Sequence, residues 1–226
     1  MQKKNHEQDE KPVYTHQHPK QDFQVERIAF FSDAIFAIAI TLLVIEFKIP
    51  QITKDSTYAQ VLHEVAELKY KFFALILSFA LITNYWMRHH LLFKHLHNYN
   101  RQIVLANMIS LLPMIFFPFT TAFFYESSNY KDIIIIPFRL FILNNILAGA
   151  TSYFLYLTIM KRFNKMVYPM EKSDEKEFRL KLLMMTISFI LVYIFSYLMY
   201  IEYTFIGLLP ILIVNLYDKY FKKKTQ

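Results

Sequence analysis

The sequence predicts an all-α integral membrane protein with six transmembrane helices. Hydrophobic residues make up 55% of the 226-residue chain, and they are gathered in long blocks. Runs of roughly 18 or more apolar residues can cross a hydrocarbon layer about 30 Å thick at 1.5 Å of rise per residue. The alternating polarity over about ten residues that is typical of β-barrel strands is absent.

Six apolar segments are expected to form the spanning helices. Pro113, Pro118, Pro137 and Pro210 lie inside these segments or at their edges, and each is expected to kink or begin a helix. The segments are residues 28–48, 70–93, 103–125, 133–160, 180–200 and 203–221. Residues 28–221 then form one transmembrane domain between a flexible N-terminal tail, residues 1–27, and a basic C-terminal tail, residues 222–226.

The positive charges predict the orientation of the chain in the membrane. Nineteen of the 25 Lys and Arg residues fall in the N-terminal tail, in residues 88–101 and 161–181, and at the C-terminus. These segments share one side of the membrane if six helices alternate in direction. Cytoplasmic loops retain positive charge, so both termini are expected in the cytoplasm. The net charge of +7 is then mostly topological, and nucleic-acid binding explains it less well.

The sequence also predicts the structure of two of the connections between the spans. In residues 49–69, Val61, Leu62, Val65 and Leu68 recur at helical spacing, which predicts a short amphipathic helix at the membrane surface. Residues 171–177 alternate acidic and basic side chains and are expected to form a solvated charged loop.

The composition excludes several classes of function. The chain has two glycines, Gly149 and Gly207, and no cysteine. Phosphate-binding loops, dinucleotide folds and carbonyl-lined potassium filters all need clustered glycines, so any ion selectivity must come from side chains. No nucleophile, base and orienting group converge in a motif, and neither an enzyme, a metal site nor a cofactor is expected.

Asp33 stands close to the start of the first apolar segment, FFSDAIFAIAITLLVIEF (residues 30–47). A charge at the centre of a spanning helix costs about 2.5–3.5 kcal/mol on insertion scales, and less near an end. The residues alone leave two accounts open. Asp33 is either stabilised by the dipole of the first helical turns or belongs to a functional polar network.

Three motifs bear on this choice. The first segment opens with R-x-x-x-F-S-D, the second ends with W-x-x-H-H, and the third carries an asparagine followed by P-F-x-T. The residues are Arg27, Phe31, Ser32, Asp33, Trp86, His89, His90, Asn107, Pro118, Phe119 and Thr120. Together they resemble the prokaryotic branch of the transmembrane protein 175 family, potassium channels related to the lysosomal potassium channel of animals. The resemblance extends over essentially the whole chain.

The resemblance implies a homotetramer in the plasma membrane of a prokaryote, with membrane lipid around it. The first helix of each subunit would line a central pore that conducts K⁺ with weak to moderate selectivity. The constriction would fall on Ile38, with further apolar rings at Leu42 and Ile45. Spacings of four and three residues place these three on one stripe of a helix, although in membrane proteins such a stripe more often reflects ordinary helix packing.

Thr41 is the candidate for selectivity, because its hydroxyl lies one turn from Ile38. It could instead bond back to the carbonyl of Ala37, and the sequence leaves both open. An apolar ring offers no oxygen ligands to a dehydrating ion and gates by dewetting. Ile38 is therefore expected to act as a bottleneck that must dilate or rotate.

The resemblance also gives Asp33 a role. Arg27, Phe31, Ser32 and Asp33 would belong to a polar network that joins the first helix to the second and third. The partners would be Trp86, His89 and Asn107.

Two other functions are compatible with these residues. Asp33 could relay protons with His89 and His90 in a proton-coupled secondary transporter, since imidazole titrates near neutral pH. A non-conducting membrane scaffold is the third reading.

Overall fold

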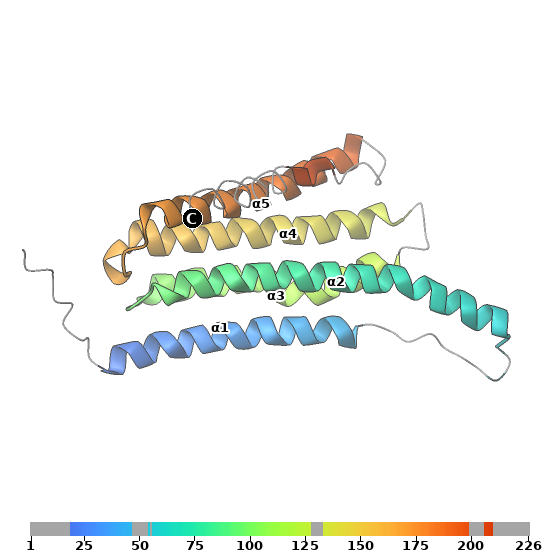
Figure 1. Cartoon of the computed structure of the whole chain (residues 1–226), viewed down its shortest axis with the longest axis horizontal. Coiled ribbons are helices and arrows are strands. Elements are labelled where there is room, and N and C mark those ends of the chain that lie inside the picture. Colours follow the sequence, from blue (N-terminus) through green and yellow to red (C-terminus); the bar gives the residue numbers. More distant parts are fainter. Residues whose placement is uncertain (1–18, 47–53, 55, 128–132, 199–205, 210–226) are drawn as a thin grey trace, which may run out of the picture.

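Five long helices, alternating in direction, make up most of the described part of the computed structural model (Figure 1). It describes residues 19–46, 54, 56–127, 133–198 and 206–209. The helices are α1 (Pro19–Ile45), α2 (Tyr58–Lys94), α3 (Arg101–Glu126), α4 (Ile135–Tyr156) and α5 (Lys172–Leu198). The described residues contain no β-strand beyond an isolated antiparallel bridge between Leu96 and Val167. The predicted all-α fold is confirmed over these ranges.

Side-chain caps define where two of the helices begin. The Thr57 hydroxyl accepts from the backbone N–H of Gln60, and the Gln60 side chain accepts from the backbone N–H of Thr57, which is a capping box at the start of α2. Asn100 caps α3 by accepting from the backbone N–H groups of Gln102 and Ile103. Each cap satisfies backbone donors that have no partner inside the helix.

The connection before the second span differs from the expectation. A separate amphipathic helix at the membrane surface was predicted, but α2 runs without a break from Tyr58 to Lys94, over 37 residues. Figure 1 shows the N-terminal part of α2 projecting past the ends of the other helices. The helical spacing was read correctly, and the break between the two helices was wrong.

The charged loop expected at residues 171–177 is also corrected, because α5 begins at Lys172. Asp174 and Glu175 lie in its first turn, where the helix dipole favours negative charge. Alternating charges are compatible with an exposed helical turn as well as with a loop. The favourable interaction of the two acidic side chains with the helix dipole supports the helix.

Three of the four prolines named above lie within described helices. α3 continues through Pro113 and Pro118, while Pro137 lies in the first turn of α4, where a missing N–H costs little. Pro210 lies outside the described residues. α4 is followed by a π-helical segment, Leu157–Arg162, and a short 3₁₀ turn, Asn164–Met166.

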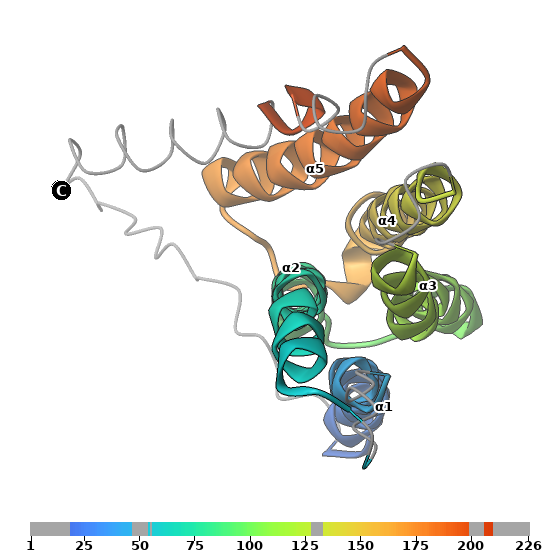
Figure 2. The same ribbon diagram turned by 90° about the vertical axis from the view of Figure 1, so that its right-hand side faces the viewer.

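The helices pack in a chain of neighbours, which Figure 2 shows from the end of the bundle. α1 packs against α2 and α3, α3 against α4, and α4 against α5. The main core lies between them and includes Phe36 of α1, Tyr85 of α2, Phe117 of α3 and Phe141 of α4. α1 stands at the edge of this arrangement with neighbours on one side.

Within the described ranges, four helical segments are long and apolar enough to cross a membrane, namely residues 24–45, 101–126, 135–162 and 172–198. The chain is therefore a multi-pass membrane protein. α2 is not among the four, although it lies beside them along their length (Figure 1). The sixth predicted segment, residues 203–221, lies mostly outside the described residues, so a count of six spans stays a prediction.

The close packing of α4 against α5 at Gly149 can be tested by mutation. A β-carbon at this position would collide with the Thr186 hydroxyl, so Gly149→Ala should destabilise the fold by about 1–3 kcal/mol through overpacking. Thermal unfolding of the purified protein in detergent measures the effect. Adding Thr186→Ala should restore the lost stability, because the two changes share one contact.

Ala150 gives the matched control, since it is the next residue of α4 and is exposed. Ala150→Leu should leave the melting temperature unchanged. An unchanged melting temperature for Gly149→Ala itself would show that the two helices do not pack as closely as described.

Candidate functional site

One face of α1 is buried against the rest of the bundle. Ser32, Phe36, Ala39 and Leu43 are almost wholly inaccessible, and their spacings of four, three and four residues place them on one side of a helix. Phe36, Ala39 and Leu43 join the main core. This face therefore fixes α1 against α2 and α3.

The opposite face of α1 is apolar and open. Ile38 is 56% exposed and Ile45 is 70% exposed. In its most apolar stretch only 22% of the residues are buried, against 33–56% in the other three membrane-capable segments. Among those four segments α1 is thus the most hydrophobic and the least covered within one chain.

The predicted pore residues occupy this open face to different degrees. Ile38, Ile45 and Thr41 are exposed, whereas Leu42 is half-buried at the edge of the face. The Thr41 hydroxyl donates to the carbonyl of Ile38 at 2.9 Å, and not to that of Ala37. The donated proton points back to the helix, so the lone pairs of the hydroxyl oxygen stay free to face a cation.

A chain of hydrogen bonds joins α1 to α3 and α2 at Ser32. Asn107 Nδ2 donates to Ser32 Oγ at 2.9 Å, and Ser32 Oγ donates to the carbonyl of Ile28 at 2.9 Å. His89 Nε2 lies 2.7 Å from Asn107 Oδ1. Because an amide oxygen only accepts, the proton of His89 resides on Nε2. Ser32 and Asn107 are both 0% exposed, so their polar atoms depend on one another.

Aromatic rings hold the His89 imidazole in place. The ring of Phe93 stacks on it with centroids 4.3 Å apart, and Phe36 lies 5.4 Å away. Neither phenylalanine was expected at the site. Phe93 follows His89 by four residues, a spacing that brings side chains together on a helix and was the available signal.

Asp33 makes the second link between α1 and α2. Trp86 Nε1 donates to Asp33 Oδ1 at 2.9 Å, and the Trp86 ring lies 5.6 Å from that of His90. A charge-assisted hydrogen bond of this kind is stronger than one between neutral groups. His90 is exposed while His89 is buried, so the adjacent histidines occupy different faces of α2.

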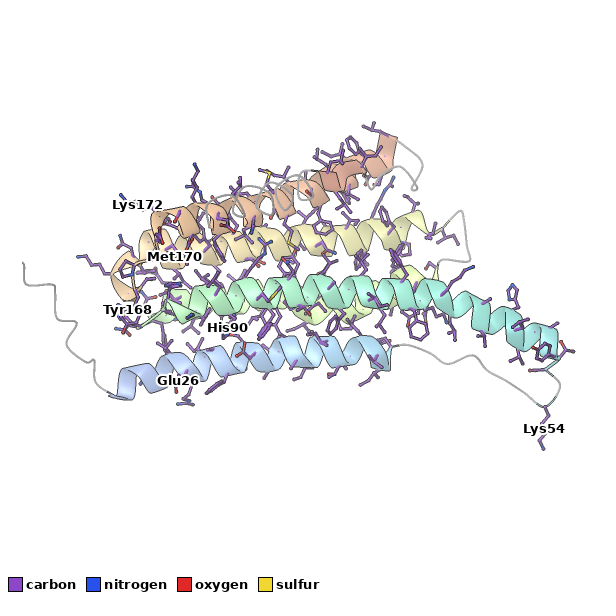
Figure 3. All side chains as sticks on the ribbon, in the orientation of Figure 1. Glu26, Lys54, His90, Tyr168, Met170 and Lys172 are labelled. Carbon is purple, nitrogen blue, oxygen red and sulfur yellow. The ribbon has the colours of Figure 1, made fainter. Side chains whose placement is uncertain are left out.

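A cavity of about 370 Å³ lies beside Asp33, between α1 and the end of α2. Glu26, Asp33, His90 and Tyr168 are among its lining residues, and Figure 3 shows Glu26, His90 and Tyr168 at the same end of the bundle. In the part of the chain that the structure describes, no three His, Asp or Glu side chains are grouped as metal ligands.

Two expected members stand apart from these links within the single chain. Arg27 is exposed, and Phe31 is 51% exposed on the open side of α1. The structure thus brings together Ser32, Asp33, Trp86, His89 and Asn107, and it leaves Arg27 and Phe31 facing outward.

Comparison with known proteins bears on the same residues. Residues 27–118 match the sequence profile of the family described as endosomal/lysosomal potassium channel TMEM175. Over these residues the chain is similar to the TMEM175 family. The matched range begins at Arg27 and includes α2 and most of α3, so it contains every residue of the two hydrogen-bonded links. The resemblance seen in the sequence is confirmed.

Two relatives show the same extent of similarity. The chain is 38% identical over 100 residues to a potassium channel of Chamaesiphon minutus, covering 44% of this chain and 49% of that protein. It is 31% identical over 100 residues to a potassium channel of Streptomyces collinus, covering 44% and 47%. The matched region thus spans about half the length of these two relatives.

Structural similarity extends further than sequence similarity. The crystal structure of a lysosomal potassium-selective channel TMEM175 homolog from Chamaesiphon minutus superimposes with a TM-score of 0.68. The match covers 86% of this chain and 96% of that chain at 22% identity. At this identity the likeness shows a shared fold, which includes α4 and α5 beyond the region matched by the TMEM175 profile.

Asn107 gives the most direct test of the buried link. Asn107→Leu removes the acceptor of His89 and the donor of Ser32 while keeping a similar volume. Each buried polar group left without a partner costs about 1–3 kcal/mol, so the melting temperature in detergent should fall clearly. Gln102→Leu changes an exposed residue on a different face of α3 and is the control. Its melting temperature should differ little from that of the unchanged protein. Equal melting temperatures for the two variants would contradict the role given to Asn107.

Proposed function

We propose that the chain is one subunit of a homotetrameric, potassium-selective cation channel whose central pore is lined by α1. The observation that carries the proposal is the open apolar face of α1, which includes Ile38 and Ile45. Relatives in the TMEM175 family are named potassium channels, and this likeness supports the choice of ion.

In the proposed tetramer, the open faces of four α1 helices surround a central axis. A spanning helix with half of its surface uncovered must meet lipid, other subunits or a pore. When α1 lies at the axis, Ile38 forms a ring of four apolar side chains, with Ile45 forming a second ring and Leu42 at the edge. Such a ring excludes water when narrow and passes hydrated or partly dehydrated ions when it widens.

Selectivity in this proposal comes from the hydroxyl of Thr41. It is the one side-chain oxygen on the exposed stripe between Ile38 and Ile45. Four such oxygens near the constriction would partly replace the hydration shell of K⁺. A single ring of hydroxyls is a weaker filter than successive rings of carbonyls, so the selectivity is proposed to be weak to moderate.

The two polar links set the rotation of α1 about its own axis. Ser32 and Asp33 are bonded to α3 and α2 respectively. Successive residues of a helix are separated by about 100°, so turning α1 by one position would move Ile38 off the axis and would also break both links. In this proposal Asp33 positions the pore helix and does not bind the permeant ion.

The chain is proposed to lie in the plasma membrane of a prokaryote with both termini in the cytoplasm. The concentration of Lys and Arg in the tails and in residues 88–101 and 161–181 supports this orientation. The proton-coupled transporter is less well supported, because His89 is already bonded to Asn107. Saturable flux driven by a pH gradient would favour it.

Ile38 tests the pore. In a planar bilayer with K⁺ on one side and Na⁺ on the other, the unchanged protein should reverse near the K⁺ equilibrium potential. Ile38→Asn should increase the current and move the reversal potential toward zero, because a polar ring stays hydrated. Ile38→Leu keeps the apolar character and is the control. Identical currents and reversal potentials in Ile38→Asn and the unchanged protein would refute a constriction at Ile38.

Asp33 tests the positioning of the helix. Asp33→Ala leaves Trp86 Nε1 without its acceptor at a cost of about 1.5–3 kcal/mol, and the yield of tetramer in size-exclusion chromatography should fall. Asp33→Asn retains an oxygen that can accept from Trp86 and should assemble better than Asp33→Ala. A normal tetramer of Asp33→Ala that carries normal currents would rule out the positioning role.

A further inference from the structure

Two cavities lie between α2 and α5, away from the pore helix. One, of about 430 Å³, is lined almost entirely by apolar side chains, including Leu77 and Leu81 of α2 and Phe189 and Val192 of α5. The other, of about 460 Å³, is lined by charged and polar side chains mixed with apolar ones. Figure 2 shows α2 and α5 on the same side of α4.

The two cavities belong to one cleft. From Leu77 to Arg88 along α2 there are eleven residues, and from Phe189 to Phe178 along α5 there are also eleven. At 1.5 Å per residue each interval is about 17 Å. α2 and α5 are antiparallel (Figure 1), so equal steps along both helices lead from the apolar cavity to the charged one.

The charged cavity lies at the level where both helices change character. α2 becomes polar from Asn84 onward, with Arg88 and His95 at this cavity, and α5 is charged up to Lys181 before its apolar run. Figure 3 shows Met170, which also lines the cavity, and Lys172 at this end of the bundle, with Lys54 at the opposite end. A membrane protein exposes such a boundary to lipid headgroups.

Both signs of charge face the charged cavity. Glu171, Asp174 and Glu177 border it together with Arg88 and Lys181. Asp174, Glu177 and Lys181 recur at helical spacing along one stripe of α5. Glu177 and Lys181 are paired at 2.6 Å.

Arg88 has hydrogen-bonding capacity that the described residues leave unused. Its Nε donates to Asn84 Oδ1 at 2.8 Å, whereas its buried Nη1 has no hydrogen-bond partner within the described residues. A buried guanidinium nitrogen without an acceptor is costly. The Arg88 side chain also borders the charged cavity, so an anionic oxygen in that cavity would pair with its charge, and a cationic group on the same ligand would suit the carboxylates of α5.

We propose that this cleft binds a zwitterionic phospholipid with a primary ammonium in its headgroup, of the phosphatidylethanolamine class. The phosphate lies at Arg88, the ammonium lies near Glu171 and Asp174, and an acyl chain occupies the apolar cavity. The charge pattern selects the headgroup. An anionic phosphatidylglycerol brings no cation to the carboxylates, and the trimethylammonium of phosphatidylcholine donates no N–H hydrogen bond to them.

The bound lipid would join α5 to α2. α5 is held to α4 by Arg139, which donates to Ser196 Oγ at 3.1 Å and to the Ser196 carbonyl at 2.7 Å. Toward its N-terminal end, Glu175 accepts from Tyr156 and Lys161. The lipid supplies the link on the opposite side of α5, and the site does not depend on the pore or on K⁺ conduction.

Native mass spectrometry of the full-length protein tests the site. Delipidated protein is titrated separately with phosphatidylethanolamine, phosphatidylcholine and phosphatidylglycerol of identical acyl chains. Phosphatidylethanolamine should bind about tenfold more tightly than the other two, because its ammonium adds hydrogen bonds to carboxylates. Arg88→Gln should weaken its binding about tenfold for the same reason at the phosphate. Arg101→Gln, an exposed cation at the start of α3, is the control and should bind as the unchanged protein does.

A second pair of variants keeps the test independent of the folding of Arg88→Gln. Glu171→Gln and Asp174→Asn lie at exposed positions, and together they should abolish the preference for phosphatidylethanolamine over phosphatidylcholine without preventing the binding of either. Equal binding of all three lipids, tighter binding of phosphatidylglycerol, or a preference that survives the carboxylate changes would overturn the proposal. Absence of any bound lipid would do the same and would indicate that protein fills the cleft.

Discussion

The hydrogen bond between Ser32 and Asn107 is the contact on which the arrangement of α1 depends. Both side chains are fully buried, so neither can exchange its partner for water, and a buried polar group without a partner is expensive. The apolar contacts of Phe36, Ala39 and Leu43 add to this constraint, because rotating α1 would unpack side chains that are buried in the main core. The polar contact and the apolar contacts therefore favour the same rotation of α1 about its axis.

From this fixed rotation follows the surface that α1 leaves uncovered. A hydrophobic helix with one covered face leaves its other face open in a single chain, and the proposed tetramer turns this open face of α1 toward the central axis and the other subunits. The α2–α5 cleft presents the opposite case. There the group without a partner among the described residues is on a cation, Arg88, and its proposed partner is a lipid headgroup in place of another copy of the chain. At both places polar groups determine the geometry of the contact, and apolar side chains contribute most of the contact area.

The sequence predicted the fold class and the positions of the first five helices because long apolar runs have few alternatives in a membrane. The resemblance to the TMEM175 family implied Trp86, His89 and Asn107 as partners of the first helix, whereas the residues alone left the role of Asp33 open. The resemblance also implied Arg27 and Phe31 as members of this network, but both are exposed and make no contact with it in the single chain. The sequence did not predict that α2 is continuous through Lys69, because the amphipathic pattern before that residue is the same in a bent and in a straight helix. Residues 171–177 were taken for a loop, because alternating charges are compatible with an exposed helical turn as well as with a loop.

Accessibility of α1 to aqueous reagents tests the central claim most directly. The chain has no cysteine, so single cysteines at Ile38, Ile45 and, as a control, the exposed Leu147 of α4 can be compared without a background. A charged, membrane-impermeant thiol reagent should block the current of the Ile38→Cys or Ile45→Cys channel and leave the Leu147→Cys channel unaffected. Full current after modification at both α1 positions, or block at Leu147 alone, would contradict a pore lined by α1.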